Sequence, residues 1–257
     1  MKNKNRNGRS GPLETALFNS IVMGDTKKVR HILLEYNVDV NVCGGDMNST
    51  PLHHACHLHK IGIVRLLLEH GADPAAKNED GTTPLHFACR DDYTAPYIAR
   101  LLLEHGAKVN AKNKWGNTAL HDACKMSVCN SAVEFLIKNG ADVNASNKNG
   151  HTPLKGACQH RNPQVVKLLL EAGADANREK YDMGTPLEVA MQLPHDDPMR
   201  EEIIDLFREY APEATLESVL KLRPEDPLRE KTLDWYREHY PELVMERWCT
   251  AGLGMGI

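Results

Sequence analysis

A seven-residue motif recurs along the chain at a nearly constant interval, and it constrains the fold more than any other feature. The copies TPLHHAC, TPLHFAC, TALHDAC, TPLKGAC and TPLEVAM begin at Thr50, Thr83, Thr118, Thr152 and Thr185, at steps of 33, 35, 34 and 33 residues. A diverged copy, TALFNSI, begins at Thr15. This period indicates units of one supersecondary element each, which bury their apolar faces only by stacking on one another.

Each copy has the composition of a helix start. A threonine hydroxyl can cap a helix, and proline suits the first helical position because its missing N–H has no intrahelical partner there. The leucine that follows predicts a buried anchor, and the alanine allows a neighbouring helix to pack closely. A second apolar segment, such as LLLEHGAD from Leu66, ends at a residue that can leave the helix in the left-handed conformation. These residues are Gly71, Gly106, Gly140 and Gly173, with Asn37 in the first unit.

The paired motifs resemble the ankyrin-repeat family, whose signature is T-P-L-H-x-A followed by a second helix that ends in L-L-x-x-G-A-D-V-N. The resemblance covers about residues 13–211 and implies an all-α fold: a solenoid of stacked helix-turn-helix units with projecting β-hairpin loops. Units are expected near residues 12–45, 46–78, 79–113, 114–147, 148–180 and 181–211. Residues 1–11 are expected to be a disordered leader, and residues 212–257 a helical C-terminal extension with a flexible tail.

Charge and cysteine content narrow the functional classes. The formal net charge of -4 gives no overall field that would gather nucleic acid or an anionic membrane. No run of 18 apolar residues predicts a membrane span. The seven cysteines lack a framework spacing, which favours a reducing compartment. We therefore expect a cytoplasmic monomer whose partner is a protein, folded or peptide, and neither nucleic acid nor membrane.

The segment TPLHHACHLHK at residues 50–60 raises the alternative of a metal site, since His53 with His57, or His54 with Cys56 and His57, could share an ion on one helix. His53 recurs as His86 and His121, however, and the resemblance implies that this imidazole bonds backbone and hydroxyl groups across units. Cys56 recurs as Cys89, Cys124 and Cys158 and is expected to be a small buried apolar group. Stacked helices lie roughly 8 to 10 Å apart, too far for a disulfide between adjacent units. We expect no metal and no cofactor.

Two groups of positions are not needed to maintain the fold and are therefore free to bind a partner. They are the residues on either side of the turn glycines Gly81, Gly116 and Gly150, and residues of the first helices next to the repeated Ala-Cys pair. The predicted protein-binding residues are Met47, His54, His57, Glu79, Asp80, Phe87, Arg90, Lys114, Trp115, Asp122, Lys125, Met126, Lys148, His151 and Gln159. Trp115 is the principal candidate, because a tryptophan at a loop tip has no core to fill and tryptophan often carries interface energy. The alternative is that Trp115 folds back onto the next loop.

Phe87 and Met126 are expected to form an apolar floor beside Trp115, flanked by Arg90, Lys114 and Lys125. For Phe87, partial burial between helices is the alternative.

Prolines divide the C-terminal extension into three helical candidates, the first capped by Thr215 and the last beginning at Pro241. Such helices could cap the stack by covering its last unit. The alternative is a recruiting element, since TLESVLKL at residues 215–222 loosely resembles the start of a ubiquitin-ligase-binding box. In that case the chain is the substrate-recognition adaptor of a larger complex. The sequence departs from the box at Leu220, where a small residue is expected, and lacks its proline motif.

The sequence contains none of the common catalytic motifs: no phosphate-cradling glycine loop, nucleophile elbow, paired-histidine zinc helix or paired-cysteine metal motif. The Thr, His and Cys residues that could be combined into a triad belong to repeated columns. The sequence therefore predicts a non-enzymatic module, a scaffold or adaptor, that binds a partner protein on its concave face.

Overall fold

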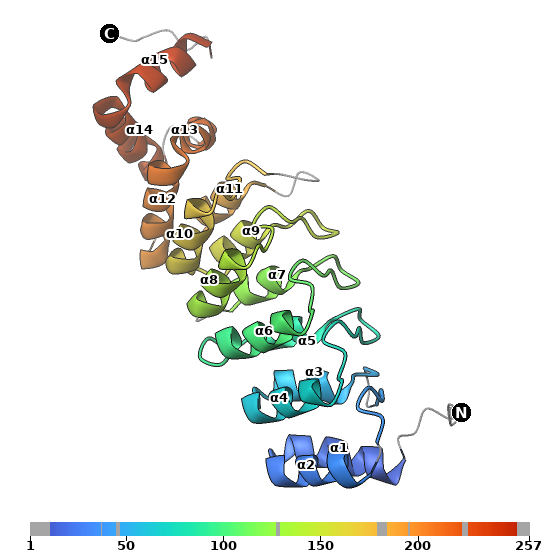
Figure 1. Ribbon diagram of the computed structural model, residues 1–257. Coiled ribbons are helices and arrows are strands. Elements are labelled where there is room, and N and C mark those ends of the chain that lie inside the picture. Colours follow the sequence, from blue (N-terminus) through green and yellow to red (C-terminus); the bar gives the residue numbers. More distant parts are fainter. Residues whose placement is uncertain are drawn as a thin grey trace.

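The computed structural model describes residues 11–36, 38–44, 47–126, 129–178, 184–194, 196–222 and 226–250, with the side chains of 227 and 246–250 excepted. Within these ranges helix pairs stack in chain order into an elongated array, with loops projecting from one side (Figure 1). The first helices of the pairs are α1 (Pro12–Val22), α3 (Pro51–His57), α5 (Pro84–Ala88), α7 (Ala119–Cys124), α9 (Pro153–Gln159) and α11 (Pro186–Met191). The second helices are α2 (Thr26–Glu35), α4 (Ile61–Glu69), α6 (Ala95–Glu104), α8 (Asn130–Lys138), α10 (Pro163–Glu171) and α12 (Pro198–Tyr210).

The first helices begin where the repeated motif predicts. Thr50 precedes α3, and its hydroxyl accepts a hydrogen bond from the backbone N–H of His53, while Pro51 occupies the first helical position. Thr83, Thr118, Thr152 and Thr185 hold the same place before α5, α7, α9 and α11. A side-chain oxygen thus satisfies one of the N–H groups that have no partner inside the helix.

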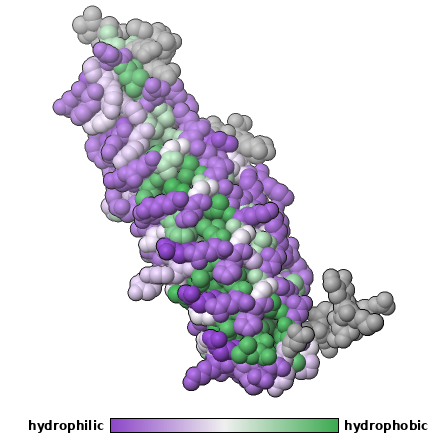
Figure 2. All heavy atoms as spheres, in the orientation of Figure 1, coloured by the Kyte–Doolittle hydropathy of each residue, from purple (hydrophilic) through white to green (hydrophobic). Residues whose placement is uncertain are grey.

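The core runs the length of the stack rather than filling one centre. The predicted anchor leucines Leu52, Leu85, Leu120, Leu154 and Leu187 are all buried. Each contributes about 1.5 to 3 kcal/mol by burial of its side chain. Apolar residues gather in a band along the stack between hydrophilic margins (Figure 2). Each unit therefore depends on its neighbours for most of its stabilisation.

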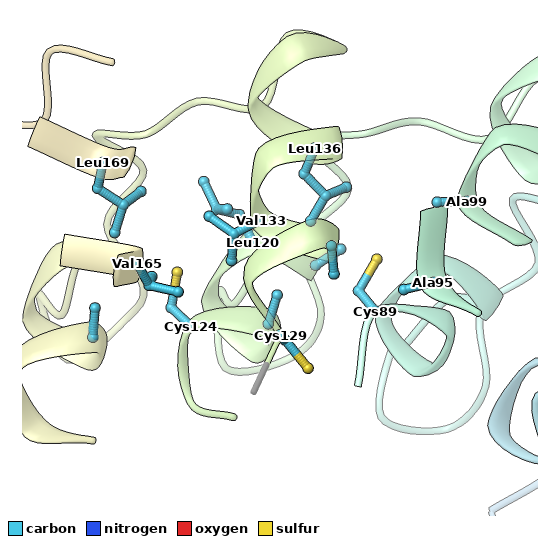
Figure 3. Close-up of a cluster of buried hydrophobic side chains, with 14 of the residues drawn as sticks. Cys89, Ala95, Ala99, Leu120, Cys124, Cys129, Val133, Leu136, Val165 and Leu169 are labelled. Carbon is cyan, nitrogen blue, oxygen red and sulfur yellow. The ribbon is translucent and has the colours of Figure 1, made fainter. Parts of the chain in front are cut away.

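The predicted column of buried cysteines is confirmed. Cys89 and Cys124 are fully buried, and Cys129 from the start of the next second helix joins them beneath Leu120 and Val133 (Figure 3). Burial raises the pKa of these thiols, that of Cys129 to about 11 with a further contribution from the nearby Asp92 carboxylate. The thiols are therefore protonated near neutral pH and pack as small apolar groups. The free cysteines are Cys43, Cys56, Cys89, Cys124, Cys129 and Cys158.

The turns after the second helices use left-handed glycine as predicted. Gly71 and Gly140 have φ of 84° and 82°, and a Cβ at either position would meet nothing within 4 Å. Gly184 corresponds instead to the loop glycines Gly81, Gly116 and Gly150, one position out of register, and it too has a left-handed φ, of 73°. Asn37 lies outside the described residues.

An asparagine staple that the sequence reasoning did not predict fastens these turns to one another. The amide of Asn110 donates to the carbonyl of Gly140 at 3.0 Å and accepts from the backbone N–H of Asp142 at 2.8 Å. Asn41, two units earlier, and Asn144, one unit later, make both contacts with the turn that follows each of them. The staple therefore links the turn after one second helix to the turn after the next.

The projecting loops owe their shape mainly to side-chain hydrogen bonds. The described residues contain no strand, and β-pairing in the loops is represented there by one bridge, Gly44 with Ser49. The Oδ1 atom of Asn113 accepts from the backbone N–H groups of Trp115 and Asn117, both at 3.0 Å. Asn78 and Asn147 do the same in the neighbouring loops. A buried or half-buried asparagine thus closes each of these three turns.

The C-terminal extension contains α13 (Pro212–Leu220), α14 (Pro227–His239) and α15 (Pro241–Thr250). The expectation that Thr215 caps the first of these helices is wrong. Ala211 alone separates α12 from α13, so Thr215 already lies inside α13 and its hydroxyl donates to the carbonyl of Ala211 at 2.9 Å. Pro241 begins α15 as expected. Residues 1–10 and 251–257, predicted to be a disordered leader and a flexible tail, lie outside the described residues, whereas Gly11 directly precedes α1.

The extension repeats the construction of the preceding unit at an offset of 29 residues. DPMREEIIDLFREYAPE at 197–213 aligns with DPLREKTLDWYREHYPE at 226–242. Asp197 caps α12 and Asp226 caps α14 in the same way, and both helices have 13 residues. The residues after them, Ala211 and Tyr240, adopt nearly the same torsions, -143°/58° and -140°/58°. The pair α13 and α14 thus follows α11 and α12 with a shorter connection and no projecting loop.

Candidate functional site

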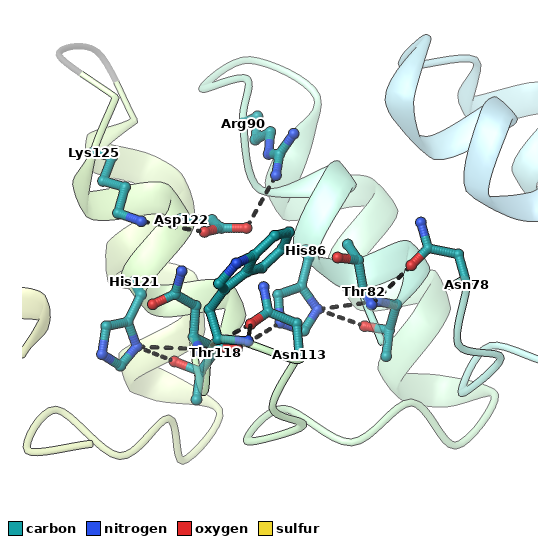
Figure 4. A network of polar contacts seen from close by, with 12 residues as sticks. Asn78, Thr82, His86, Arg90, Asn113, Thr118, His121, Asp122 and Lys125 are labelled. Atoms are coloured by element: carbon teal, nitrogen blue, oxygen red, sulfur yellow. Dashed lines mark hydrogen bonds and ion pairs between the residues drawn. The ribbon is translucent and has the colours of Figure 1, made fainter. Parts of the chain in front are cut away.

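The histidines of residues 50–60 differ in their surroundings: His53 is buried and hydrogen-bonded, whereas His57 is exposed. His53 accepts the backbone N–H of Thr50 at Nδ1, and its Nε2 bonds the carbonyl of Thr82 in the next unit at 3.0 Å. His86 and His121 make the same contacts with Asn117 and His151 (Figure 4). The structural role predicted for this column is therefore confirmed.

Burial lowers the pKa of His53 and of His121 to about 4, because an imidazolium inside the stack would lose its hydration. The hydrogen bond from Nε2 to the carbonyl of the next unit opposes part of this lowering of the pKa, because a carbonyl oxygen stabilises the protonated ring. Among the described residues, no three His, Cys, Asp or Glu side chains lie together in a way that could hold a metal ion.

Backbone hydrogen bonds join each projecting loop to the next and hold the loops in register. The N–H of Lys114 donates to the carbonyl of Asp80 at 2.8 Å, and the N–H of Lys148 donates to the carbonyl of Trp115 at 2.9 Å. Glu79 makes the same contact with Met47 at 3.1 Å. The loop tips therefore form one continuous edge along which the predicted residues lie at fixed intervals.

Trp115 is exposed at this edge. Its side chain is 48% accessible, and the Nζ atom of Lys114 lies 4.5 Å from the ring centroid. Lys114 also forms an ion pair with Asp80 of the preceding loop. The indole is thus in contact with a cation, and about half of its surface remains accessible.

Phe87 is half-buried and belongs to a pocket between the second and third units. The pocket encloses about 410 Å³ and is lined by Gly44, Met47, Ser49, His53, His54, His57, Phe87 and Arg90. The ring of His57 meets Phe87 edge-on at 5.4 Å, and the Arg90 guanidinium covers Phe87 at 4.9 Å. Neither Trp115 nor Met126 lines this pocket. The pocket therefore does not bring Phe87 together with these two residues, as the expected apolar floor would require.

Asp122 differs from the other predicted binding residues because it is buried, with 7% of its surface accessible. Its carboxylate accepts a bond from Arg90 at 3.1 Å and lies 3.9 Å from Lys125 (Figure 4). Asp122 therefore orients two cations at the surface rather than presenting its own charge. The remaining predicted residues are exposed or half-buried: Met47, His54, His57, Glu79, Asp80, Phe87, Arg90, Lys114, Trp115, Lys125, Met126, Lys148, His151 and Gln159.

Sequence reasoning missed Asn78, Asn113 and Asn147, which hold the loop tips in position. Their spacing of 35 and 34 residues matches the repeat, so a column comparison extended beyond the seven-residue motif would have found them. Within the described part of the chain, no helix is both long and apolar enough to cross a membrane.

Family profiles described as "Ankyrin repeats (3 copies)" match residues 73–147, 110–180 and 126–212, and one described as "Ankyrin repeats (many copies)" matches 52–93. The chain is 39% identical over 75 residues to a 2-5A-dependent ribonuclease of Mus musculus, covering 29% of this chain and 10% of that protein. It is 46% identical over 56 residues to palmitoyltransferase AKR1 of Lachancea kluyveri, covering 22% and 8%. A transient receptor potential channel homologue of Caenorhabditis elegans is 36% identical over 81 residues, covering 32% and 7%. The chain thus spans a tenth or less of these relatives.

Proposed function

Since the chain belongs to the ankyrin-repeat family, whose repeats are generally non-catalytic protein-interaction modules, we propose that it binds a partner protein on the side lined by its first helices and projecting loops. The observation that carries the proposal is the exposed, cation-supported indole of Trp115 at the continuous edge of loop tips. A rigid, half-exposed aromatic side chain can bury a large area on contact at little cost in side-chain entropy.

The pocket beside Phe87 also supports the proposal that the partner binds on this side of the stack. It is largely apolar and combines ring edges, the Met47 thioether and the Arg90 guanidinium, which suits an inserted side chain of a partner. The chain in this proposal acts as a non-enzymatic scaffold and as a monomer. A cytoplasmic location fits the buried free thiols.

The C-terminal extension, in this proposal, covers the end of the stack. Leu216 and Val219 of α13 and Leu233 and Tyr236 of α14 are buried within the protein, so these apolar groups serve internal packing. The Oη atom of Tyr236 donates to the carbonyl of Pro212 at 2.7 Å, which ties the two helices together. The adaptor alternative would need an apolar surface that these residues do not leave free.

The experiment that tests the proposal is partner capture from cell extract with purified variants. Trp115→Ala should weaken capture by about 2 kcal/mol, or roughly 30-fold, as expected for a central anchor. Met47→Ala, at the pocket, should weaken it less. Tyr97→Ala is the matched control, because Tyr97 is 62% exposed on the second helix α6 and lies outside the proposed surface. Capture that survives Trp115→Ala and Met47→Ala but fails with Tyr97→Ala would place the binding surface on the other side.

A further inference from the structure

One column at the C-terminal ends of the first helices contains, from the second unit onward, only hydrogen-bond donors with amide or basic side chains, whereas the first unit has Val22 at this place. His57 and Gln159 are the last residues of α3 and α9, Lys125, Gln192 and Lys221 immediately follow α7, α11 and α13, and Arg90 lies two residues beyond α5. We name these six residues the donor row. All six are exposed or half-buried, and none is acidic.

Contacts between neighbours show that the first members of the donor row lie side by side. His57 and Arg90 both contact the Phe87 ring, at 5.4 and 4.9 Å. Arg90 and Lys125 both contact the Asp122 carboxylate. At the other end, the Nζ atom of Lys221 lies 3.5 Å from Glu188 of α11, so the repeated construction of the extension carries the row one unit beyond the sixth.

The helix dipole does not account for the composition of this row. A basic residue at a helix C-terminus gains a little from the dipole, and an acidic residue there loses by it. The second helices α2, α4, α6 and α10 nevertheless all end in glutamate, at Glu35, Glu69, Glu104 and Glu171. Helix ends of this protein thus tolerate acidic residues freely, and their absence from the donor row requires another reason.

The spacing of the row matches an extended peptide. Stacked helices lie roughly 8 to 10 Å apart, so successive donors are separated by about that distance. A polyproline II chain has three residues per turn at about 3.1 Å each, and therefore presents the same face every 9 Å or so. One residue in three would then face one donor, unit after unit.

We propose, resting on the proposed function, that the donor row binds an acidic segment of the partner in an extended, polyproline II conformation, with a carboxylate at every third residue. Carboxylates accept strong bonds from Arg, Lys and amide donors. Asp122 and Glu188 hold the cations of the row in place, while Gln159 and Gln192 supply neutral donors between them.

The test uses fluorescein-labelled peptides and fluorescence anisotropy. The probe is (Glu-Pro-Pro)5, and the comparator has the same composition with its five glutamates contiguous. The periodic peptide should bind about tenfold more tightly than the contiguous one, because only its carboxylates reach successive donors. Equal affinities, or no binding of the periodic peptide up to about 1 mM, would overturn the proposal.

Matched variants separate the donor row from general charge effects. Gln159→Glu places a carboxylate in the row and should weaken binding of the periodic peptide about tenfold. Gln164→Glu adds the same charge at an exposed position of α10, outside the row, and should change the affinity by less than about twofold. Equal effects of the two variants would overturn the proposal that the donor row is the binding site. If partner capture still depends on Trp115 in that case, the proposed function stands without it.

Discussion

The imidazole of His53 donates from Nε2 to the carbonyl of Thr82, 29 residues away, at 3.0 Å. Its Nδ1 atom accepts the backbone N–H of Thr50, so both ring nitrogens are used by neutral histidine. One side chain thereby caps its own helix and fastens the next projecting loop. The same arrangement recurs in three consecutive units. These histidines therefore join neighbouring units by hydrogen bonds, as the leucine column joins them by apolar packing.

Replacement of His86 by alanine should destabilise the protein by about 1 to 3 kcal/mol, since it leaves the buried carbonyl of Asn117 and the cap at Thr83 without a partner. Urea denaturation followed by circular dichroism measures this as a lower midpoint. His160→Ala is the control, because His160 is exposed, and its change should stay within about 0.5 kcal/mol. A similar loss in both variants would contradict the role assigned to His86.

Stability should fall as pH is lowered from 7 toward 4. Free histidine has a pKa near 6.5, whereas the pKa of His53 and of His121 in the folded protein is about 4. Between these values the unfolded chain binds protons that the folded chain does not bind. The contribution of these groups is complete above about pH 6.5 and is lost as pH approaches 4, at up to about 3 kcal/mol each.

Urea midpoints between pH 7 and pH 5, where most carboxylates stay ionised, measure this dependence. A variant with His53→Gln and His121→Gln should be less stable at pH 7 and show a flatter profile. An unchanged slope would mean that other groups cause the loss.

Gly116→Ala should cost more than Gly140→Ala, although both glycines have left-handed φ, of 81° and 82°. The added Cβ of Gly116 would lie 2.9 Å from the backbone nitrogen of Lys148, whereas that of Gly140 would meet nothing within 4 Å. Gly140→Ala should lose about 1 kcal/mol from backbone strain alone, and Gly116→Ala a further 1 kcal/mol or more. Thermal denaturation of both variants gives the difference, and equal losses would show that the loops can separate without cost.

Leu120→Ala should destabilise the stack by about 2 to 5 kcal/mol, because it removes a side chain that is 1% exposed and leaves a cavity between units. Met126→Ala, at 36% exposure in the same unit, should cost less than about 1 kcal/mol. Chemical denaturation with an unchanged m-value checks both. A Leu120 variant with a midpoint near that of wild type would show that the column is not the source of stability.

Deletion of residues 212–257 should lower stability by at least about 2 kcal/mol, since it exposes the end of α12. Arg208 is buried there and bonds the hydroxyl of Thr232 in α14, and Phe207 beside it is fully buried. Calorimetry of the shortened chain measures the change, with Met245→Ala at an exposed site of α15 as the control. A shortened chain that melts like wild type but loses a partner would favour the recruiting alternative.

Sequence reasoning failed where a position depends on contacts from another unit. Asp122 occupies the same column as His54 and Phe87, yet it is buried because Arg90 of the preceding unit and Lys125 of its own converge on it. Phe87 was expected beside Trp115, but its ring packs toward His57 in the preceding unit. The seven-residue motif does not predict the 29-residue repetition of the extension, because α13 lacks that motif and only Ala211 connects it to α12.

From the amino-acid sequence alone one can predict the repeat period, the caps at the motif threonines, the buried leucine and cysteine columns and the left-handed glycine turns. These features are local or periodic, so the period alone fixes them. Which polar side chains are free depends on the folded stack, because the burial of Asp122, the ion pair of Lys114 with Asp80 and the register of the loop tips arise between units. Such contacts depend on which residues stacking brings together, and a single unit's sequence does not contain them.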